Sequence, residues 1–403
     1  MHRLSLLCCS LAVLVVAGRI VAEAVGPTAG ALAATSEARK EWTREQRDGW
    51  ARELRGAYAK PPAEWPAAVA MPGVEVVELG PLPDVVDPAD NPRNPEKTEL
   101  GRMLFFDPRL SSSNQIACAS CHDPDLGWAD GRTVSFGHQR TVLKRNAPTA
   151  MHSGHMSRLF WDGRASTLEE LTVSVIENQN ELRSQREDLE RELAAIPEYR
   201  ERFEKAFGEG GVTIGRIAKA VAAFCRTLEG GRSEFDRFLA GRSDALSDAA
   251  VRGLHLFRTE GHCINCHMGP TLTDDKLHNT GLSLFNRPFQ DLGAYEVTGR
   301  VEDMGAFKTP PLRHIARTRP YMHHGLFENL EVTVRAYNAG MPEPSHKPRT
   351  PGGPMPVKSP LIVPLNLSEQ DMQDIIAFLE ALTEPHRVVR PPALPPDPVA
   401  AEE

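Results

Sequence analysis

Two five-residue segments with one pattern constrain this chain more than any other feature: CASCH at 118–122 and CINCH at 263–267. Thiols at this spacing can add to the two vinyl groups of a haem, and the adjacent histidine then lies under the iron. A single match would also fit a redox dithiol or half of a zinc site. Two matches favour two covalently bound haem c groups. The residues that would hold them are Cys118, Cys121 and His122 for the first and Cys263, Cys266 and His267 for the second.

A short helical pattern precedes each of the two segments. Gly101 to Phe105 and Gly253 to Phe257 both read Gly-x-x-Leu-Phe, and the two motif units are about 145 residues apart, as expected of two related domains. Apolar residues share one helical face between Ile214 and Leu228, and a capping pattern at Ser368 begins another helix. Because strand signals are few and short, we expect a mainly α fold with long connecting loops.

Residues 1–24 have the pattern of a signal peptide. His2 and Arg3 precede an apolar stretch of 14 residues, which is too short to span a bilayer comfortably, and Ala22, Glu23 and Ala24 form a small-residue cleavage site. Without cleavage the segment would act as an anchor. With cleavage, the sequence predicts an exported, periplasmic protein that has no transmembrane segment.

Residues 25–95 are interpreted as an N-terminal extension and linker. The first part, to about residue 41, is rich in Gly, Ala and Thr and is expected to be disordered. Thr43 and Gln46 form a capping-box pattern that begins a polar helix towards Tyr58, and the Pro- and Asp-rich stretch at 81–95 indicates a linker. The formal net charge of −8 supplies no basic face, so we expect no nucleic-acid partner.

Further motifs surround the two Cys-x-x-Cys-His segments. They are CASCHDPDLGWADGR at 118–132, RNAPT at 145–149, FWDGRASTLEE at 160–170, LHNTG at 277–281, FKTPPLR at 307–313 and YMHHG at 321–325. With these motifs the chain resembles the bacterial di-haem cytochrome c peroxidases and their MauG-type relatives, over residues 100–383. The resemblance implies two cytochrome c-like helical domains, a peroxidatic one at 96–240 and an electron-transfer one at 241–386, and then a Pro-rich tail at 387–403.

The resemblance also implies catalytic roles for two residues. Glu181 occupies the place of the family's distal glutamate, which moves a proton on bound peroxide, although a lone glutamate is more often a solvated carboxylate. Trp161 matches the tryptophan between the haems, where an indole can carry electrons, and it would also serve as a core residue. His138 follows His122 at the spacing at which some relatives have a histidine that caps the first iron in the resting state. The alternative is a solvated loop histidine.

A calcium site between the domains is implied by three residues. Asn146 would use its side-chain oxygen, and Thr318 and Pro320 mainly their backbone carbonyls, as a hard cation prefers. Two positions depart from the family pattern: Leu171 stands where glutamine is common, and Val175 stands where proline is common. The pocket around Glu181 is therefore expected to be less polar than in relatives.

Two residues near the end of the chain can bind the second iron. Counted from Thr318, Tyr337 stands at the family position that holds Met in the peroxidases and Tyr in the MauG type. Met341 follows one helical turn later. A thioether favours ferrous iron and a high potential, whereas a phenolate favours ferric iron and a lower one. Tyr337 is the expected ligand, Met341 is the alternative, and binding by neither residue is the third possibility.

The resemblance predicts a periplasmic oxidoreductase that reduces hydrogen peroxide at haem one with electrons relayed through haem two. The alternatives are a MauG-type enzyme that oxidises side chains of a partner protein and a non-catalytic di-haem electron-transfer cytochrome. The implied partners are hydrogen peroxide and either a small c-type cytochrome or cupredoxin as electron donor or a protein substrate. A homodimer is also compatible with the family.

Overall fold

The computed structural model describes residues 35–344, 347 and 352–396, and within them the fold is mainly helical, as predicted. The predicted signal peptide and its cysteines lie outside the described residues. The α-helices are α1 (Ser36–Arg39), α2 (Arg44–Tyr58), α3 (Pro95–Phe106), α4 (Leu168–Glu177), α5 (Arg186–Ala195), α6 (Pro197–Phe207), α7 (Ile214–Cys225), α8 (Glu234–Leu239), α9 (Asp248–Arg258), α10 (Tyr295–Thr298), α11 (Leu330–Asn338) and α12 (Glu369–Ala381). The two short strands β1 (Leu277–His278) and β2 (Phe307–Lys308) pair antiparallel, with Leu277 opposite Lys308.

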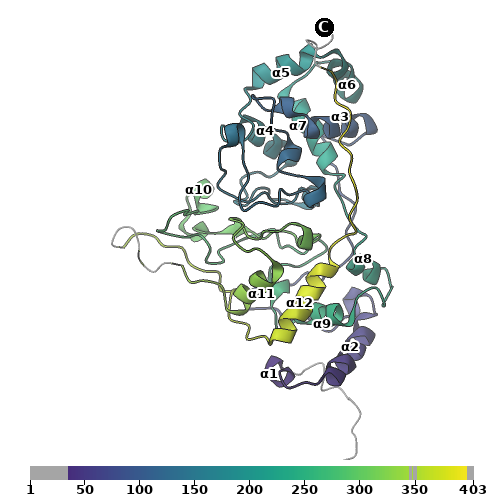
Figure 1. Cartoon of the computed structure of the whole chain (residues 1–403), viewed down its shortest axis with the longest axis vertical. Coiled ribbons are helices and arrows are strands. Elements are labelled where there is room, and N and C mark those ends of the chain that lie inside the picture. Colours follow the sequence, from purple (N-terminus) through teal and green to yellow (C-terminus); the bar gives the residue numbers. More distant parts are fainter. Residues whose placement is uncertain (1–34, 345–346, 348–351, 397–403) are drawn as a thin grey trace, which may run out of the picture.

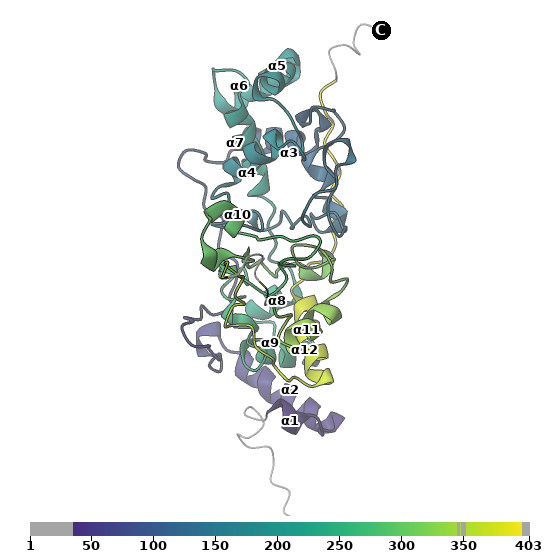
Figure 2. The same cartoon turned by 90° about the vertical axis from the view of Figure 1, so that its left-hand side faces the viewer.

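The molecule is elongated and has two lobes, which are stacked along its long axis (Figures 1 and 2). The first lobe contains α3 to α7 around an apolar core built from residues 100–228. The second contains α8, α9, α11 and α12 around a core that also includes residues from the N-terminal segment. Long loops fill the space between the two helical cores, and these loops carry most of the sequence motifs.

The repeated Gly-x-x-Leu-Phe pattern has the same structural role in both lobes. A Cβ atom on Gly101 would lie 1.8 Å from the carbonyl oxygen of Ala220, at the crossing of α3 and α7. A Cβ atom on Gly253 would lie 1.9 Å from the carbonyl oxygen of Asp374, at the crossing of α9 and α12. Glycine is needed at both positions because it alone lets the two backbones approach so closely. The internal repeat is thus confirmed as two related helix pairs.

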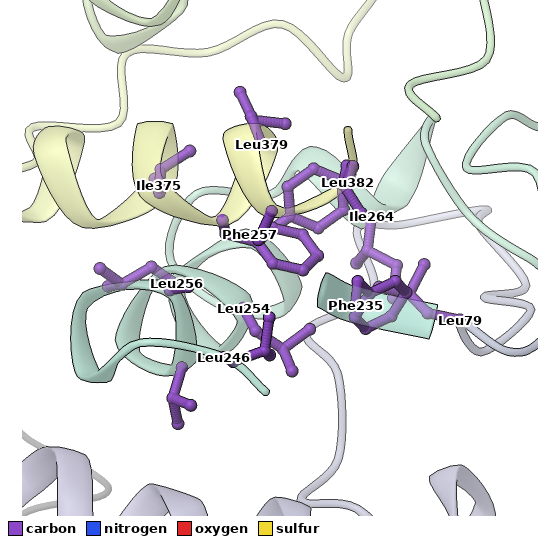
Figure 3. Close-up of a cluster of buried hydrophobic side chains, with 14 of the residues drawn as sticks. Leu79, Phe235, Leu246, Leu254, Leu256, Phe257, Ile264, Ile375, Leu379 and Leu382 are labelled. Atoms are coloured by element: carbon purple, nitrogen blue, oxygen red, sulfur yellow. The ribbon is translucent and has the colours of Figure 1, made fainter. Parts of the chain in front are cut away.

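The N-terminal segment packs on the second lobe. Thr43 and Gln46 form the predicted capping box of α2, and Trp50, Leu54 and Tyr58 on that helix are buried in the second core. Figure 3 shows part of this core, in which Leu79 of the N-terminal segment lies beside Phe235 and Ile264. The segment before residue 95 therefore contributes to a folded core.

The prediction of disorder up to about residue 41 is wrong for its last part. Residues 36–39 form α1, capped by Thr35, and the side chain of Arg39 is only 1 % exposed. Arg39 forms ion pairs with Asp371 and Glu260 of the second lobe. Composition missed this helix because the residues that stabilise it are remote from it in the sequence.

The C-terminal tail runs from the second lobe along the first (Figures 1 and 2). Val389 packs against the first core, and Arg102 of α3 donates a hydrogen bond to the carbonyl oxygen of Arg390. Among the described residues, no helix combines the length and the apolar character that a membrane crossing requires.

Candidate active site

The two Cys-x-x-Cys-His segments fold into the same local structure. The first three residues of each form a single 3₁₀ turn, Cys118–Ser120 and Cys263–Asn265. The backbone N–H of His122 donates to the carbonyl oxygen of Cys118 at 3.0 Å, and that of His267 donates to the carbonyl oxygen of Cys263 at 2.9 Å. None of the four motif cysteines forms a disulfide, so their sulfur atoms are available for attachment to haem vinyl groups.

Both motif histidines are held in one tautomer by a backbone carbonyl. Nδ1 of His122 lies 3.1 Å from the carbonyl oxygen of Trp128, and Nδ1 of His267 lies 3.0 Å from that of Leu272. A carbonyl oxygen can only accept, so Nδ1 carries the hydrogen and Nε2 keeps its lone pair. Burial lowers the pKa of His122 and lowers that of His267 to about 4, so both rings are neutral, as an iron ligand must be.

One continuous cavity of about 830 Å³ joins the two motifs. Its wall includes the four motif cysteines, both motif histidines and many apolar side chains. Burial raises the pKa of Cys118 to about 12 and that of Cys263 also to about 12, so both side chains are neutral thiols before a group is attached. Apolar walls, vinyl-reactive thiols and neutral histidines with a free Nε2 fit two covalently attached haems.

Glu181 lies on the wall of this cavity, in the loop that follows α4. Its Oε1 accepts a hydrogen bond of 2.8 Å from the side-chain amide of Asn178. Burial raises the pKa of Glu181 to about 6, although the charge of Arg164 and the bond from Asn178 act in the opposite direction. A carboxyl group with this pKa can both take and give a proton near neutral pH.

His138 is close to Glu181 in the backbone but lies behind the cavity wall. Its N–H lies within hydrogen-bond distance of the carbonyl oxygens of Asn180 (3.1 Å) and Glu181 (2.9 Å). The ring is buried, and its Nδ1 lies 3.4 Å from Oγ of Ser112. Gly137, its neighbour, does line the cavity, and a Cβ there would meet the carbonyl oxygen of Asn180 at 1.8 Å. The structure therefore brings the His138 backbone, but not its imidazole, to the site.

Trp161 lies on the cavity wall and connects the two halves of the chain. Its indole N–H donates to the carbonyl oxygen of Asn146 at 2.9 Å, and its own carbonyl oxygen accepts from the N–H of Lys308 at 2.7 Å. Its ring also meets His323 edge-on, with ring centroids 6.4 Å apart. These contacts fix the indole orientation at the junction of the lobes.

Of the two candidate ligands near the end of the chain, only Tyr337 lines the cavity. It lies on α11, and burial together with the nearby Cys266 and Cys263 raises the pKa of its phenol well above the usual range. Met341 lies just beyond α11, is buried away from the cavity wall, and donates its N–H to the carbonyl oxygen of Ala336. The geometry thus places the phenol, rather than the thioether, next to the second motif.

The three residues predicted to bind calcium all contribute to the same cavity wall. The side-chain Nδ2 of Asn146 donates to the carbonyl oxygen of Arg132 at 2.6 Å, which leaves its Oδ1 on the opposite side of the amide group. Thr318 and Pro320 stand directly before the YMHHG motif in the sequence. The structure brings these residues to one region, between the two motif loops.

Two polar networks at this junction were not singled out as functional from the sequence. Arg145 forms a bidentate ion pair with Asp291 (2.7 and 2.9 Å) and donates a 2.5 Å hydrogen bond to Asp162. It therefore connects the RNAPT and FWDGR motifs to the second half of the chain. Asp274 accepts a 2.8 Å hydrogen bond from His278 beside Cys266. Arg145, Asp162 and His278 lie inside the quoted motifs, and that was the available signal in the sequence.

Comparison with known proteins agrees with this site. The model of the di-haem cytochrome c peroxidase family matches residues 95–244, and the cytochrome c model matches residues 250–383. The chain is 37 % identical to the cytochrome-c peroxidase IdrP1 of Denitromonas iodatirespirans, over 76 % of this chain and 87 % of that protein. It is 36 % identical to the methylamine utilization protein MauG of Methylophilus methylotrophus, over 76 % of this chain and 88 % of that one.

The fold is also similar to a solved structure described as a MauG-like protein associated with microbial copper homeostasis. That match has a TM-score of 0.67 and 33 % sequence identity, and it covers 75 % of this chain and 95 % of the other. Identities of 36 % and 37 % over three quarters of the chain, with two haem-attachment motifs on one cavity, establish the family. This chain belongs to the di-haem cytochrome c peroxidase and MauG family of oxidoreductases and is an enzyme of that class.

Proposed function

We propose that this protein is a periplasmic enzyme that reduces hydrogen peroxide at its first haem site, with electrons relayed from its second. The observation that carries the proposal is the single cavity lined by both Cys-x-x-Cys-His segments, Glu181 and Trp161. When bound, the two haems supply an iron that binds peroxide and a second iron that exchanges electrons. The protein side chains supply the proton transfer, the orientation and the exclusion of water.

Glu181 is the residue that moves the proton. A carboxylate oxygen of Glu181 would take a proton from one oxygen of hydrogen peroxide and return it to the other oxygen, which leaves as water. Its pKa of about 6 suits both steps, because the group is readily deprotonated and readily reprotonated near neutral pH. The Asn178 side-chain amide orients the carboxyl group, and the neighbouring Leu171 and Val175 keep that part of the wall apolar.

Trp161 lines the cavity that joins the two sites and would carry electrons between them. Its indole nitrogen is hydrogen-bonded to a backbone carbonyl, so the ring is held in one orientation on the shared wall. Asn146 accepts this bond, and Asn146 is also a proposed calcium ligand together with Thr318 and Pro320. A calcium ion there would hold the two halves in register around Trp161.

A second candidate function is oxidation of side chains on a partner protein, as in MauG-type enzymes. It is favoured by the position of Tyr337, because a phenolate on the second iron stabilises the ferric state better than the thioether of Met341. The methylamine utilization protein MauG is as similar to this chain as the relatives that are named peroxidases. A third candidate, a plain electron-transfer cytochrome, would leave Glu181 without a role.

The test is peroxide turnover by the Glu181→Gln variant, in which the side chain keeps its shape but cannot exchange a proton. We expect both haems to be retained and turnover to fall by roughly 10²- to 10⁴-fold, the usual contribution of a general acid–base. Glu187→Gln on the exposed face of α5 is the matched control and should retain full activity. Full activity in Glu181→Gln would reject Glu181 as the acid–base residue. If the unaltered protein does not turn over peroxide, a plain electron-transfer cytochrome is the remaining candidate function.

A further inference from the structure

The N-terminal segment carries a chain of aromatic side chains that begins at the protein surface. Three of the five tryptophans in the sequence lie before residue 66. Half-buried Trp42 meets Trp50 with ring centroids 5.6 Å apart, and Trp50 meets His255 of α9 at 5.8 Å. His255 lies 5.9 Å from Tyr58, and Tyr58 lies 5.1 Å from Trp65. No gap between neighbouring rings exceeds ordinary edge-to-face contact.

Tyr58 has the hydrogen-bond partners that proton-coupled oxidation of a phenol requires. Its Oη lies 2.9 Å from Nδ1 of His255 and accepts a 2.7 Å bond from the guanidinium of Arg258. Since arginine can only donate, the phenolic hydrogen is free to point at Nδ1. Burial raises the pKa of Tyr58 to about 12, so the phenol keeps its proton at neutral pH and must pass it on when an electron leaves.

The same segment is clamped onto the second haem-attachment loop. The N–H of Met71 donates to the side-chain oxygen of Asn265, inside the CINCH motif, at 2.6 Å. The amide of Asn265 donates to the carbonyl oxygen of Val69, and the N–H of Gly269 donates to that of Val77. Tyr58 is hydrogen-bonded to His255 and Arg258 of α9, and Phe257 of the same helix lines the cavity, so this helix, about 10 Å in diameter, lies between Tyr58 and the second site.

We propose that these aromatic residues form an electron path from the surface at Trp42 to the second haem site, with Tyr58 as its buried redox-active step. The inference rests on the proposed peroxidase function, which supplies hydrogen peroxide as the oxidant. The family models match residues 95–244 and 250–383, so every ring of the path except that of His255 lies before the matched domains. Four of the five rings of the path, those of Trp42, Trp50, Tyr58 and Trp65, belong to the N-terminal segment.

The chemistry balances with one-electron steps. Tyr58 gives one electron to the oxidised second site while its phenolic proton moves from Oη to Nδ1 of His255. An electron arriving through Trp42 and Trp50 from an external one-electron reductant restores the phenol, and the proton returns. Two such cycles, with two protons from solvent, supply the two electrons that reduce one hydrogen peroxide to two waters.

The arginines beside the path are paired with carboxylates, so their charges oppose oxidation of the rings less strongly. Arg39 lies 4.9 Å from the ring of Trp50, but it is paired with Asp371 and Glu260. Arg258 lies 5.3 Å from the rings of Tyr58 and Trp65, but it is paired with Glu78. An unpaired cation beside a ring would oppose removal of an electron from it, because the oxidised ring is positively charged.

The test uses the two-haem protein mixed with one equivalent of hydrogen peroxide without a reductant, frozen rapidly and examined by electron paramagnetic resonance. We expect a tyrosyl radical signal that is lost in Tyr58→Phe. Tyr295→Phe, on α10 and outside the path, is the matched control and should keep the signal. In aerated buffer, dissolved dioxygen adds to the Trp42 radical, so peptide mass spectrometry of the same samples should find oxygenated Trp42, and this product should be lost in Tyr58→Phe and in Trp50→Phe.

Peroxide consumption in the same samples separates the two proposals. If peroxide is consumed while both path variants keep the radical and the Trp42 product at the level of the unaltered protein, the path is wrong and the peroxidase function stands. If peroxide is not consumed, the function fails and the path fails with it. Haem content and the unfolding midpoint show whether each variant is folded, and Trp50→Phe tests the path should Tyr58→Phe not fold.

Discussion

Replacing Gly101 by alanine tests why the two lobes share their helix-crossing pattern. The added Cβ would lie 1.8 Å from the carbonyl oxygen of Ala220, so α3 and α7 must separate by at least about 1 Å. Overpacking of this kind costs about 1–3 kcal/mol, and the better helix propensity of alanine returns about 0.5–1 kcal/mol. We therefore expect the free energy of unfolding to fall by about 1–2 kcal/mol, measured by guanidinium denaturation of the protein with both haems attached.

The control is Gly56→Ala in α2. Nothing lies within 4 Å of the Cβ position of Gly56, so only the helix-propensity term acts there, and this variant should be slightly more stable than the unaltered protein. Gly253→Ala at the crossing of α9 and α12 should behave like Gly101→Ala, because its Cβ would lie 1.9 Å from a backbone oxygen. The reasoning is refuted if Gly101→Ala is as stable as Gly56→Ala.

Three further predictions concern the junction and the site. Burial raises the pKa of Asp291, but the hydrogen bonds and charge of Arg145 outweigh it and hold this pKa at about 2. The resulting stabilisation of about 2.5 kcal/mol should be complete above pH 5 and be lost towards pH 2. Urea unfolding midpoints measured against pH would show this dependence, and Asp291→Asn should abolish it. Tyr337→Phe should change the absorption spectrum and reduction potential of the second haem, whereas Met341→Leu should change neither; the reverse result would assign the thioether. Gly137→Ala should displace the backbone beside Glu181 and lower peroxide turnover by up to roughly 100-fold with both haems kept, whereas unchanged turnover would show that this contact is not needed.

Local patterns in the sequence were sufficient for the features that depend on neighbouring residues. The capping box at Thr43 and the N-cap at Ser368 begin helices where predicted, because a cap needs only residues three positions away. The two Cys-x-x-Cys-His segments carry their own turn, so their side chains could be assigned to two haem sites before the fold was known. The paired glycines were visible as a repeat, although their reason, two close helix crossings, became apparent only in the structure.

Features that depend on distant partners could not be predicted. The segment before residue 95 was interpreted as an extension and linker, yet Trp50 and Tyr58 are in the second core because α9 presents an apolar face to them. Periodicity shows that a helix has an apolar face but not which partner covers it. For His138, spacing placed the residue near the first site, but only the folded structure shows that Nδ1 of its ring lies 3.4 Å from Oγ of Ser112.

The most direct test of the central claim is a rapid-mixing absorbance experiment with hydrogen peroxide. It compares the fully oxidised protein with protein in which only the second haem has been reduced. Because Tyr337 lies on the cavity wall and the ring of His138 does not, the account predicts that the fully oxidised form reacts at once. Reaction of the half-reduced form alone would point to a capped first iron and a reduction-activated peroxidase. If neither form reacts with peroxide, the proposed function is contradicted.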